Sequence, residues 1–254
     1  MITGGSVGIG LAVAKGLAAE GVHLALCARN KERLEEEAQG IKDGWGVRVF
    51  TNKCDVSDSR QIVDFVENVL DHFGGVDILI NNAGAGTNEK IIDAPDEKWQ
   101  HFWNLHVMAA VRLSRSFMPS MAERGGGVIL NNSSICATQP LGYEPIYNTT
   151  KAALSMFSKC LANECIPMKI RVNTISPGLV ITPDWWTTAA KNAAKEGITP
   201  QEYLDNIAME NAPIKRFATP EELAHFFVYM CSDKASYCVG SNYYVDGGWL
   251  KTTN

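Results

Sequence analysis

The sequence predicts a single domain of the α/β class, a doubly wound parallel sheet with helices on both faces. Three observations lead to this prediction. Short apolar runs alternate with helical patterns along the chain, the runs are continuously apolar, and a glycine-rich turn opens the first helical pattern. Continuous apolar runs are typical of strands buried on both faces, and their alternation with helices indicates right-handed crossovers between parallel strands.

Six apolar runs are predicted to be strands. They cover residues 22–28, 47–52, 76–81, 128–133, 170–175 and 243–246. Helices are predicted between them, where apolar residues recur at helical spacing. They cover residues 9–19, 31–41, 57–73, 96–121, 147–164 and 220–230. We find no repeat or linker, so residues 1–254 are expected to form one domain of ordinary size.

The first strand departs from this pattern. A central strand of about five or six residues should precede the glycine-rich turn, but only Met1 and Ile2 precede Thr3. We expect the biological chain to begin several residues earlier; the alternative is a true truncation that weakens the centre of the sheet. The intact mass of the protein from its native source distinguishes the two.

The glycine-rich turn covers residues 3–10, with the letters TGGSVGIG. Glycine tolerates positive φ and lets a ligand approach the backbone, while free amides at a helix start attract a pyrophosphate. The spacing is Gly-x-x-x-Gly-x-Gly instead of the Gly-x-Gly-x-x-Gly of many dinucleotide folds. We predict a Rossmann-type domain that binds its cofactor through Gly4, Ser6, Gly8, Ile9 and Gly10.

Composition excludes several classes of function. The net charge of −5 argues against a nucleic-acid or anionic-membrane partner. The seven cysteines are scattered without a Cys-x-x-Cys pair, which indicates reduced thiols in a cytoplasmic protein and no metal site. No apolar run has the roughly 18–20 residues of a membrane span, and no signal peptide is expected.

Tyr147 and Lys151 are the strongest catalytic candidates. They stand four residues apart, about one helical turn, so their side chains project from the same face. A cation near a phenol lowers its pKa, which makes Tyr147 a candidate general acid/base. Ser134 lies thirteen residues earlier, after the apolar run 128–130. Taken alone, Tyr-x-x-x-Lys is also a common surface pair and Ser134 a common strand-end hydroxyl.

The combination of motifs resembles the short-chain dehydrogenase/reductase family over essentially the whole chain. The matching motifs, in the order and spacing of the family, are residues 3–10, Cys54-Asp55-Val56, Asn81-Asn82-Ala83-Gly84, Ser133-Ser134, Tyr147 with Lys151, Asn173 with Ser176-Pro177-Gly178, and Val245-Asp246-Gly247-Gly248. The resemblance implies an oxidoreductase. Tyr147 would exchange a proton with the substrate oxygen, Ser134 would hold that oxygen, and Lys151 would bind the nicotinamide ribose and keep the Tyr147 pKa low.

The end of the second predicted strand indicates which cofactor is used. An acidic residue there would bond the ribose 2′-hydroxyl of NAD, but Ala28 takes the position and Arg29 follows. A guanidinium suits the 2′-phosphate of NADP, so NADP(H) is expected, with NAD(H) less favoured; the alternative is a solvated surface arginine.

The resemblance also assigns the remaining cofactor contacts. Asp55 and Val56 match positions that contact adenine, and Asn82, Ala83 and Gly84 match the segment beside the adenosine ribose. After Pro177 and Gly178, the residues Val180 and Thr182 match positions that hold the carboxamide and a phosphate.

The chain departs from the family at one catalytic position. An ungapped alignment places His106 where the family has an asparagine. Asn104 lies two residues earlier, turned by about 200° on a helix, so it cannot simply substitute. His106 is either part of a proton relay, since its ordinary pKa is near 6.5, or a hydrogen-bonded packing residue. A relay predicts that His106→Asn shifts the acid limb of the pH–rate profile.

The substrate side is expected to be apolar. Tyr143 precedes the catalytic tyrosine, Trp185 and Trp186 follow the position of a mobile loop in the family, and residues 189–209 form a helical insertion broken at Gly197 and Pro200. We expect residues 183–212 to be a lid and the substrate to be a ketone or secondary alcohol with a hydrophobic arm. The general resemblance is to 3-oxoacyl-carrier-protein reductases and related carbonyl reductases. The two tryptophans are either a clamp or ordinary core or subunit contacts.

Two further alternatives stay open. The chain is an enzyme or a cofactor-binding sensor or scaffold that kept the fold and lost catalysis; an NAD-dependent dehydrogenase is a third possibility. Members of the family commonly form tetramers through the helix of Tyr147 and the helix before it, so a homotetramer or homodimer is expected. Candidate interface residues, which core packing explains equally well, are Met108, Val111, Phe117, Met156, Phe157 and Leu161.

Overall fold

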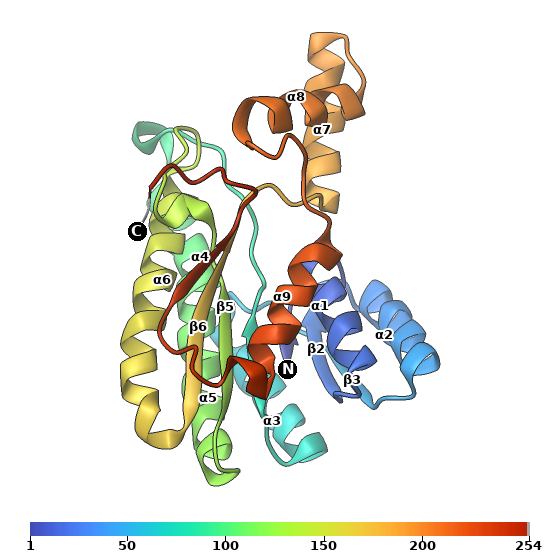
Figure 1. The fold of residues 1–254 in the computed structure, drawn as a ribbon, viewed down its shortest axis with the longest axis vertical. Helices are drawn as coiled ribbons and strands as arrows, with labels where there is room; N and C mark the ends of the chain where they lie inside the picture. Colours follow the sequence, from blue (N-terminus) through green and yellow to red (C-terminus); the bar gives the residue numbers. More distant parts are fainter. Residues whose placement is uncertain (253–254) are drawn as a thin grey trace.

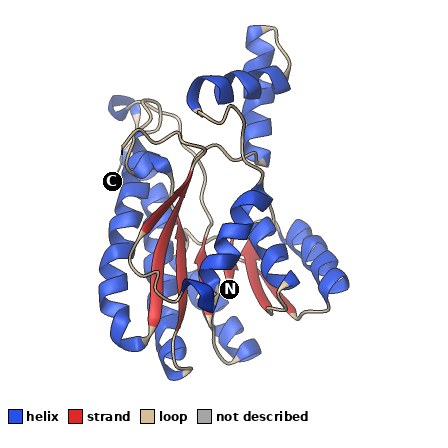
Figure 2. Cartoon of the chain, in the orientation of Figure 1, coloured by secondary structure: helices blue, strands red, loops and turns tan. Residues whose placement is uncertain are grey.

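The computed structural model describes residues 1–252, and within them seven strands form one sheet in the order β3-β2-β1-β4-β5-β6-β7 (Figures 1 and 2). The strands are β1 (Ile2–Thr3), β2 (Leu24–Ala28), β3 (Val49–Lys53), β4 (Ile78–Asn81), β5 (Gly127–Asn132), β6 (Ile170–Pro177) and β7 (Asn242–Val245). All neighbouring strands are parallel. The predicted doubly wound sheet is confirmed, and its order reverses beside β1, where such sheets bind ligands.

Helices cover both faces of the sheet. They are α1 (Gly8–Ala19), α2 (Lys31–Trp45), α3 (Ser59–Phe73), α4 (Asp96–Trp103), α5 (Ala109–Glu123), α6 (Pro145–Cys165), α7 (Pro183–Glu196), α8 (Pro200–Asn211) and α9 (Pro220–Cys231). Short 3-10 turns lie at Ile91–Asp93, Ile135–Ala137, Ile166–Met168 and Asp233–Ala235. Among residues 1–252, no helix combines the length and apolar character that crossing a bilayer requires.

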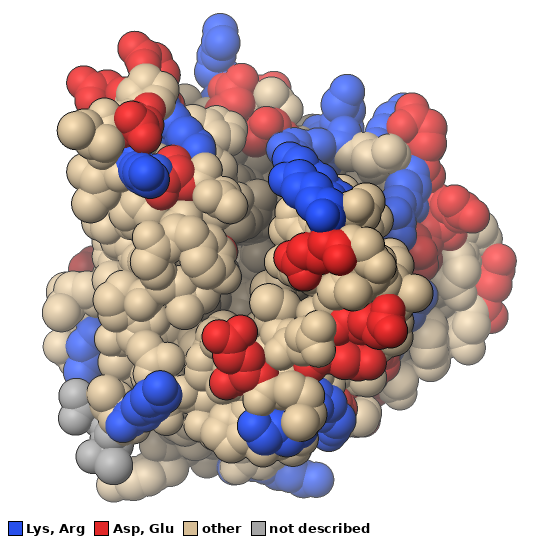
Figure 3. Space-filling model, turned by 90° about the horizontal axis from the view of Figure 1, so that it is seen from above, with Lys and Arg blue, Asp and Glu red and all other residues tan. Residues whose placement is uncertain are grey.

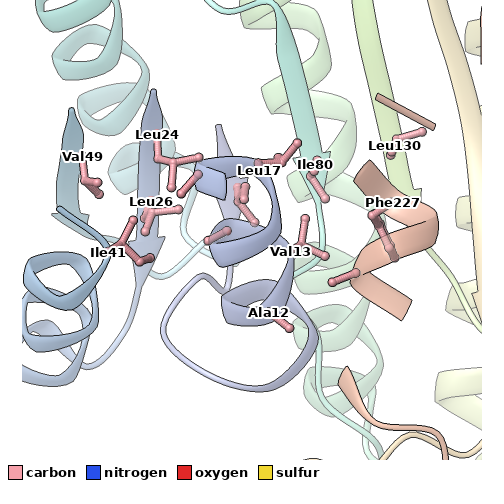
Figure 4. Packing of buried hydrophobic residues seen from close by; sticks show 14 of the residues in the cluster. Ala12, Val13, Leu17, Leu24, Leu26, Ile41, Val49, Ile80, Leu130 and Phe227 are labelled. Carbon is pink, nitrogen blue, oxygen red and sulfur yellow. The ribbon is translucent and has the colours of Figure 1, made fainter. Parts of the chain in front are cut away.

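One face of the sheet packs against α1, α2 and α9. Figure 4 shows Val13 and Leu17 of α1 between Leu26 of β2 and Phe227 of α9, and all four side chains are buried. Burying an aliphatic or aromatic side chain of this size stabilises the fold by about 1.5–3 kcal/mol. This core fixes α1, and therefore the glycine-rich turn that precedes it, against the sheet.

The other face packs against α3, α5 and α6. Phe117 and Leu161, which the sequence left open between core and subunit contact, belong to this core. Phe157 packs partly against it, whereas Met156 is 66% exposed. The core holds α6, which carries Tyr147 and Lys151, along the length of β5 and β6.

The first strand is short, as the sequence indicates. β1 consists of Ile2 and Thr3, which pair with Leu26 and Cys27 of β2, and Ile2 also pairs with Ile80 of β4. The terminal amino group of Met1 donates a hydrogen bond to the carbonyl of Ile78 at 2.7 Å. Two residues therefore bridge the centre of the sheet.

The predicted helix over residues 96–121 is three segments instead of one. Between α4 and α5 the backbone forms a π-helical turn at Asn104–Met108. Apolar periodicity does not detect such a turn, because the flanking helices keep their own spacing. π-helical turns occur frequently at functional sites, and this one carries His106.

Two helices lie beyond the carboxyl edge of the sheet (Figure 1). The predicted break between them is confirmed: Gly197 ends α7 with φ of 70°, and Pro200 begins α8 behind a capping box of Thr199 and Glu202. Glycine adopts that left-handed conformation without strain. The insertion predicted over residues 183–212 is thus a helical pair next to the edge where ligands bind.

Candidate active site

The carboxyl edge of the sheet collects the predicted site residues. Ser134 follows β5, Gly178 follows β6, and the glycine-rich turn connects β1 to α1. Viewed onto this edge, the surface is hollowed, and Lys and Arg are interspersed with Asp and Glu (Figure 3). A single basic patch for an acidic carrier protein is not visible on this face.

Lys151 is buried beside Tyr147. Its side chain is 3% exposed, and its Nζ lies 5.4 Å from the centroid of the Tyr147 ring. Nζ donates a hydrogen bond to the carbonyl of Asn132 at 2.7 Å. Burial lowers the pKa of Lys151 to about 8, because an ammonium loses solvation in the interior. The helical spacing therefore brings the two side chains together as predicted.

The expected depression of the Tyr147 pKa is corrected by the structure. Burial raises the pKa of Tyr147, and negative charge on Cys136 or Glu144 would raise it further. The neighbouring Ser134 hydroxyl acts in the opposite direction, but desolvation of the phenolate dominates. In this arrangement Tyr147 holds its proton at neutral pH, which suits a general acid.

Two adjacent serines have different roles. The hydroxyl of Ser133 donates to the carbonyl of Lys151 at 3.0 Å and lies 2.8 Å from the hydroxyl of Ser155, so it fixes α6 against β5. The Ser134 Oγ accepts the amide hydrogen of Cys136 at 3.2 Å. This leaves its own proton to donate, which is what a substrate oxygen requires.

His106 is buried and binds through both ring nitrogens. Its Nε2 accepts the amide hydrogen of Ala85 at 3.3 Å, and its Nδ1 lies 2.8 Å from the hydroxyl of Thr150. Burial, and then the charge of Lys151, lower the pKa of His106 well below its usual value. The ring is also edge-on to the ring of Tyr147, with centroids 5.5 Å apart. This geometry supports the packing alternative.

Asn104 does not take the place of His106. Its Oδ1 accepts a hydrogen bond from Arg112 at 3.4 Å, so it is turned toward α5. The prediction that it faces away from the catalytic tyrosine is consistent with this contact.

The glycine-rich turn fits a pyrophosphate. Within the described residues, no side chain caps the first turn of α1, whose N-cap is Val7, so its amides stay free for an anion. Gly4 and Gly8 have φ of 69° and 54°. A Cβ on Gly10 would lie 2.3 Å from the carbonyl oxygen of Gly4. The close turn therefore depends on glycine at these positions.

The segment after β4 is tied to this turn. The amides of Asn82 and Ala83 both donate to Thr3 Oγ1 at 2.9 Å. A Cβ on Gly84 would lie 3.5 Å from Nζ of Lys151 and 3.4 Å from the ring of His106. The three residues predicted to pass the adenosine ribose thus connect the glycine-rich turn to the catalytic side chains.

Thr182 reaches the same turn from the other half of the chain. A Cβ on Gly8 would lie 3.3 Å from the Cγ2 atom of Thr182, so Thr182 lies beside the turn, and its contact with a phosphate stays a prediction. Gly178 is equally constrained, since a Cβ there would lie 2.8 Å from the backbone of Asp246. Val180 is buried and forms a bridge with Ala218, and its contact with the cofactor stays a prediction.

The residues predicted to hold the adenine end of the cofactor lie at the ends of β2 and β3. Arg29 is exposed directly after β2, as a phosphate ligand must be. The carboxylate of Asp55 accepts the amide of Ser57 at 2.9 Å and its hydroxyl at 2.7 Å. Val56 is 4% exposed and part of the core, and its contact with adenine stays a prediction.

The predicted pair of tryptophans does not form a clamp. Trp185 packs edge-on against Phe217 at 5.1 Å and joins the apolar cluster that includes Tyr147. Trp186 is 44% exposed because it projects from the next position around α7. Tyr143 is 45% exposed at the rim.

Sequence reasoning missed several residues on the substrate side. Cys136, Leu179 and Trp249 belong to the same apolar cluster as Tyr147, and the Tyr244 hydroxyl lies 2.8 Å from that of Thr138. They come from distant parts of the chain without a shared spacing. The Gly247-Gly248 pair before Trp249 is the one sequence signal that marks a turn back toward the site.

Glu144 was also missed. Burial, and then the charge of Glu89, raise its pKa to about 7, and its carboxylate is close enough to affect the titration of Tyr147, Tyr143 and Cys136. A carboxylate beside the reactive phenol can accept hydrogen bonds from substrate hydroxyls. The described residues hold no group of three His, Cys, Asp or Glu side chains suited to a metal ion.

A protein-family model described as enoyl-(acyl carrier protein) reductase matches residues 4–250. The D-beta-hydroxybutyrate dehydrogenase of Rhizobium meliloti is 31% identical over 253 residues, covering 98% of this chain and 97% of that protein. The dehydrogenase/reductase SDR family member 4 of Sus scrofa is 33% identical, covering 98% of this chain and 85% of that protein.

Two solved structures are similar over nearly the whole chain. The L-sorbose reductase of Gluconobacter frateurii, complexed with NADPH and L-sorbose, is 58% identical with a TM-score of 0.98, covering 99% of this chain and 95% of that one. An NADPH-bound short-chain oxidoreductase of Pseudomonas aeruginosa PAO1 with an atypical catalytic center is 30% identical with a TM-score of 0.91, covering 99% and 96%.

Proposed function

The chain belongs to the short-chain dehydrogenase/reductase family, and we propose that it is an NADP(H)-dependent oxidoreductase that interconverts a ketone and a secondary alcohol. The observation that carries this proposal is the convergence of Ser134, Tyr147 and Lys151 at the carboxyl edge of the sheet, beside a glycine-rich turn with free amides.

Side chains of the protein donate and accept the proton of the reaction. NADP(H), when bound, supplies or accepts the hydride. Tyr147 donates its phenolic proton to the substrate oxygen, since burial keeps it protonated, and it takes the proton back in the oxidative direction. Ser134 donates a hydrogen bond to the same oxygen and orients it. Lys151, next to Tyr147, holds the nicotinamide ribose, and His106 fixes the helix that carries Tyr147.

The end of β2 supports NADP(H) over NAD(H). Arg29 is exposed there, and Ala28 stands where an acidic residue would repel a 2′-phosphate. The solved neighbours were obtained as complexes with NADPH, which is the cofactor that this arrangement favours.

Different residues of the site support two alternative kinds of substrate. The apolar cluster around Tyr147, with Cys136, Leu179 and Trp249, supports the hydrophobic arm expected from sequence. Glu144 and the similarity to an L-sorbose complex support a polyhydroxy ketone, which we place first because a half-buried carboxylate is a poor neighbour for an aliphatic chain.

The proposal is tested by following nicotinamide absorbance with NADPH and with NADH against L-sorbose and other ketoses, 3-oxoacyl esters and bulky aromatic ketones. Faster oxidation of NADPH than of NADH with at least one ketone supports it. Turnover of none of them despite tight NADPH binding favours the sensor or scaffold alternative.

Replacement of the catalytic phenol separates an enzyme from a sensor. Tyr147→Phe should lower kcat by a factor of about 10²–10⁴, the usual contribution of a general acid, with unchanged NADPH affinity by fluorescence titration. Tyr237→Phe, which alters an exposed tyrosine outside the site, is the matched control. Equal turnover of the two variants contradicts the role of Tyr147.

We also propose a homotetramer or homodimer in the cytoplasm. The exposed Met156 on α6 supports an assembly through that helix, and seven free thiols fit a reducing compartment.

A further inference from the structure

The helix that carries Tyr147 begins without a cap of its own. Within the described residues, the side chain of Glu144 at the N-cap of α6 makes no capping hydrogen bond, and Pro145 at the first position has no amide hydrogen. The next two amides, of Ile146 and Tyr147, are therefore the first that need an acceptor, because they precede the regular helical hydrogen bonds.

Both acceptors come from the loop after β4, more than fifty residues away in the chain. Glu89 Oε1 accepts the amide hydrogen of Ile146 at 3.1 Å, and Thr87 Oγ1 accepts that of Tyr147 at 3.4 Å. The amide of Glu89 in turn donates to the carbonyl of Tyr143 at 3.1 Å. Three hydrogen bonds thus tie this loop to the first turn of α6.

The carboxylate of Glu89 is buried and is itself held by neighbouring side chains. Its side chain is 6% exposed and pairs with Lys98 Nζ at 2.8 Å, and its Oε1 accepts the hydroxyl hydrogen of Thr87 at 3.0 Å. Burial would raise the pKa of Glu89, but hydrogen bonds from Lys98 and Ile146 hold it below its usual value. The group is therefore an anion at the positive end of α6, where the helix dipole favours it.

The other end of the same loop contacts the glycine-rich turn and His106. The amides of Asn82 and Ala83 donate to Thr3, and that of Ala85 donates to His106. One stretch of chain thus connects the nucleotide side of the site with the first turn of the catalytic helix.

We propose that Glu89, assisted by Thr87, is a positioning residue that caps α6 from the loop after β4 and fixes the direction in which Tyr147 projects. The role rests on the proposed function, in which Tyr147 is the general acid. Glu89 acts through the helix and does not touch the reacting atoms. A misplacement of about 1 Å in a catalytic group can cost as much as 10²-fold in rate, so a loosened first turn should show in kcat.

The kinetic test compares Glu89→Ala, Glu89→Gln and the control Glu97→Ala, which removes an exposed carboxylate from α4. Glu89→Ala should lower kcat at least tenfold and change the NADPH dissociation constant less than threefold. Glu89→Gln keeps an acceptor for Ile146 and should recover most of the loss. A kcat per NADPH-binding site equal to that of the wild type in Glu89→Ala overturns the proposal, and so does a Gln variant as impaired as the Ala variant.

A second measurement does not depend on turnover. Hydrogen exchange followed by NMR should show the amides of Ile146 and Tyr147 exchanging at least tenfold faster in Glu89→Ala than in Glu97→Ala, with Glu89→Gln in between. Unchanged exchange overturns the proposal. If the wild-type protein reduces no ketone, the proposed function fails while this exchange result still decides whether Glu89 caps α6.

Discussion

At residue scale, the hydrogen bonds of His106 determine which of its ring nitrogens carries the proton. The Ala85 amide is a donor, so Nε2 must accept. The Thr150 hydroxyl donates to the carbonyl of Ile146 at 2.9 Å, so it accepts from Nδ1. The ring is thus the neutral tautomer with its proton on Nδ1, and its hydrogen bonds join the loop after β4 to α6.

A neutral, fully bonded His106 should not titrate in the pH range of activity. We expect His106→Asn, which keeps a donor and an acceptor, to lower kcat about tenfold without shifting the acid limb of the pH–rate profile. His106→Leu leaves the Ala85 amide and Thr150 unpaired, which costs about 1–3 kcal/mol for each group, and should lower kcat further. His101→Asn on the exposed face of α4 is the control. A shifted acid limb in His106→Asn would restore the relay interpretation.

Glu144 should make the stability of the folded protein depend on pH. Its pKa rises from an ordinary value of 4.5 to about 7 on folding, so the folded state binds the extra proton between these values. The charged form of Glu144 destabilises the folded state. This effect is absent below pH 4.5, grows as the pH rises and is complete above pH 7. We expect Glu144→Gln to stabilise the protein by about 2 kcal/mol at pH 8 and by almost nothing at pH 4.5.

The same variant tests the substrate. If Glu144 accepts hydroxyl hydrogens, Glu144→Gln should raise KM for a ketose at least tenfold and leave KM for a ketone without hydroxyls unchanged. Glu123→Gln, at the exposed end of α5, should change neither stability nor KM. Equal effects on both classes of ketone would contradict the polyhydroxy substrate.

Sequence predicted the residues whose partners lie one helical turn or one motif away. The spacing of Tyr147 and Lys151 and the place of Ser134 after a strand became informative only within the whole series of motifs. Glu89 and Glu144 could not be found this way, because Glu89 meets Ile146 only after the loop and α6 have folded together. The pKa of Tyr147 was misjudged for a related reason: spacing reveals the cation, whereas burial of the phenol depends on the cluster around it.

At the scale of elements, apolar patterning predicted each strand from β2 to β7 within a few residues. The π-helical turn at Asn104–Met108 was not predicted, since it changes hydrogen bonding and not polarity. Its consequence is that His106 lies against Tyr147, with ring centroids 5.5 Å apart.

Arg29, at the boundary between β2 and α2, is predicted to select NADPH over NADH, and this can be tested. Arg29 lies exposed after the strand and before α2, whose first amides are capped by Asn30. We expect Arg29→Ala to raise KM for NADPH about 10–150-fold, because a charge-assisted contact to phosphate is worth about 1.5–3 kcal/mol. KM for NADH should change less than twofold. Arg33→Ala, farther along α2, is the control. Equal changes in KM for NADPH and for NADH would identify Arg29 as a solvated surface arginine.

At the scale of the whole molecule, the apolar cluster that contains Tyr147 draws side chains from distant parts of the chain. Trp185 comes from α7, Phe217 from the segment before α9, and Trp249 from the C-terminal segment. Trp185 was a candidate from the sequence, whereas Phe217 and Trp249 look like ordinary apolar residues there, which is why they were not predicted.

The exposed face of α6 is where the chain should meet a copy of itself. Met156 is 66% exposed on a helix whose opposite side is anchored in the core by Leu161. The resemblance to the family places the expected interface on this helix, and Met156 is an exposed apolar side chain there whose burial against another subunit would be favourable. We expect the wild-type protein to have the mass of four or two chains by light scattering, and Met156→Glu to reduce that mass, because a buried carboxylate without a partner is costly. Val63→Glu, on the exposed face of α3, is the control and should leave the mass unchanged. A monomeric wild-type protein, or an unchanged mass in Met156→Glu, would place the interface elsewhere or exclude it.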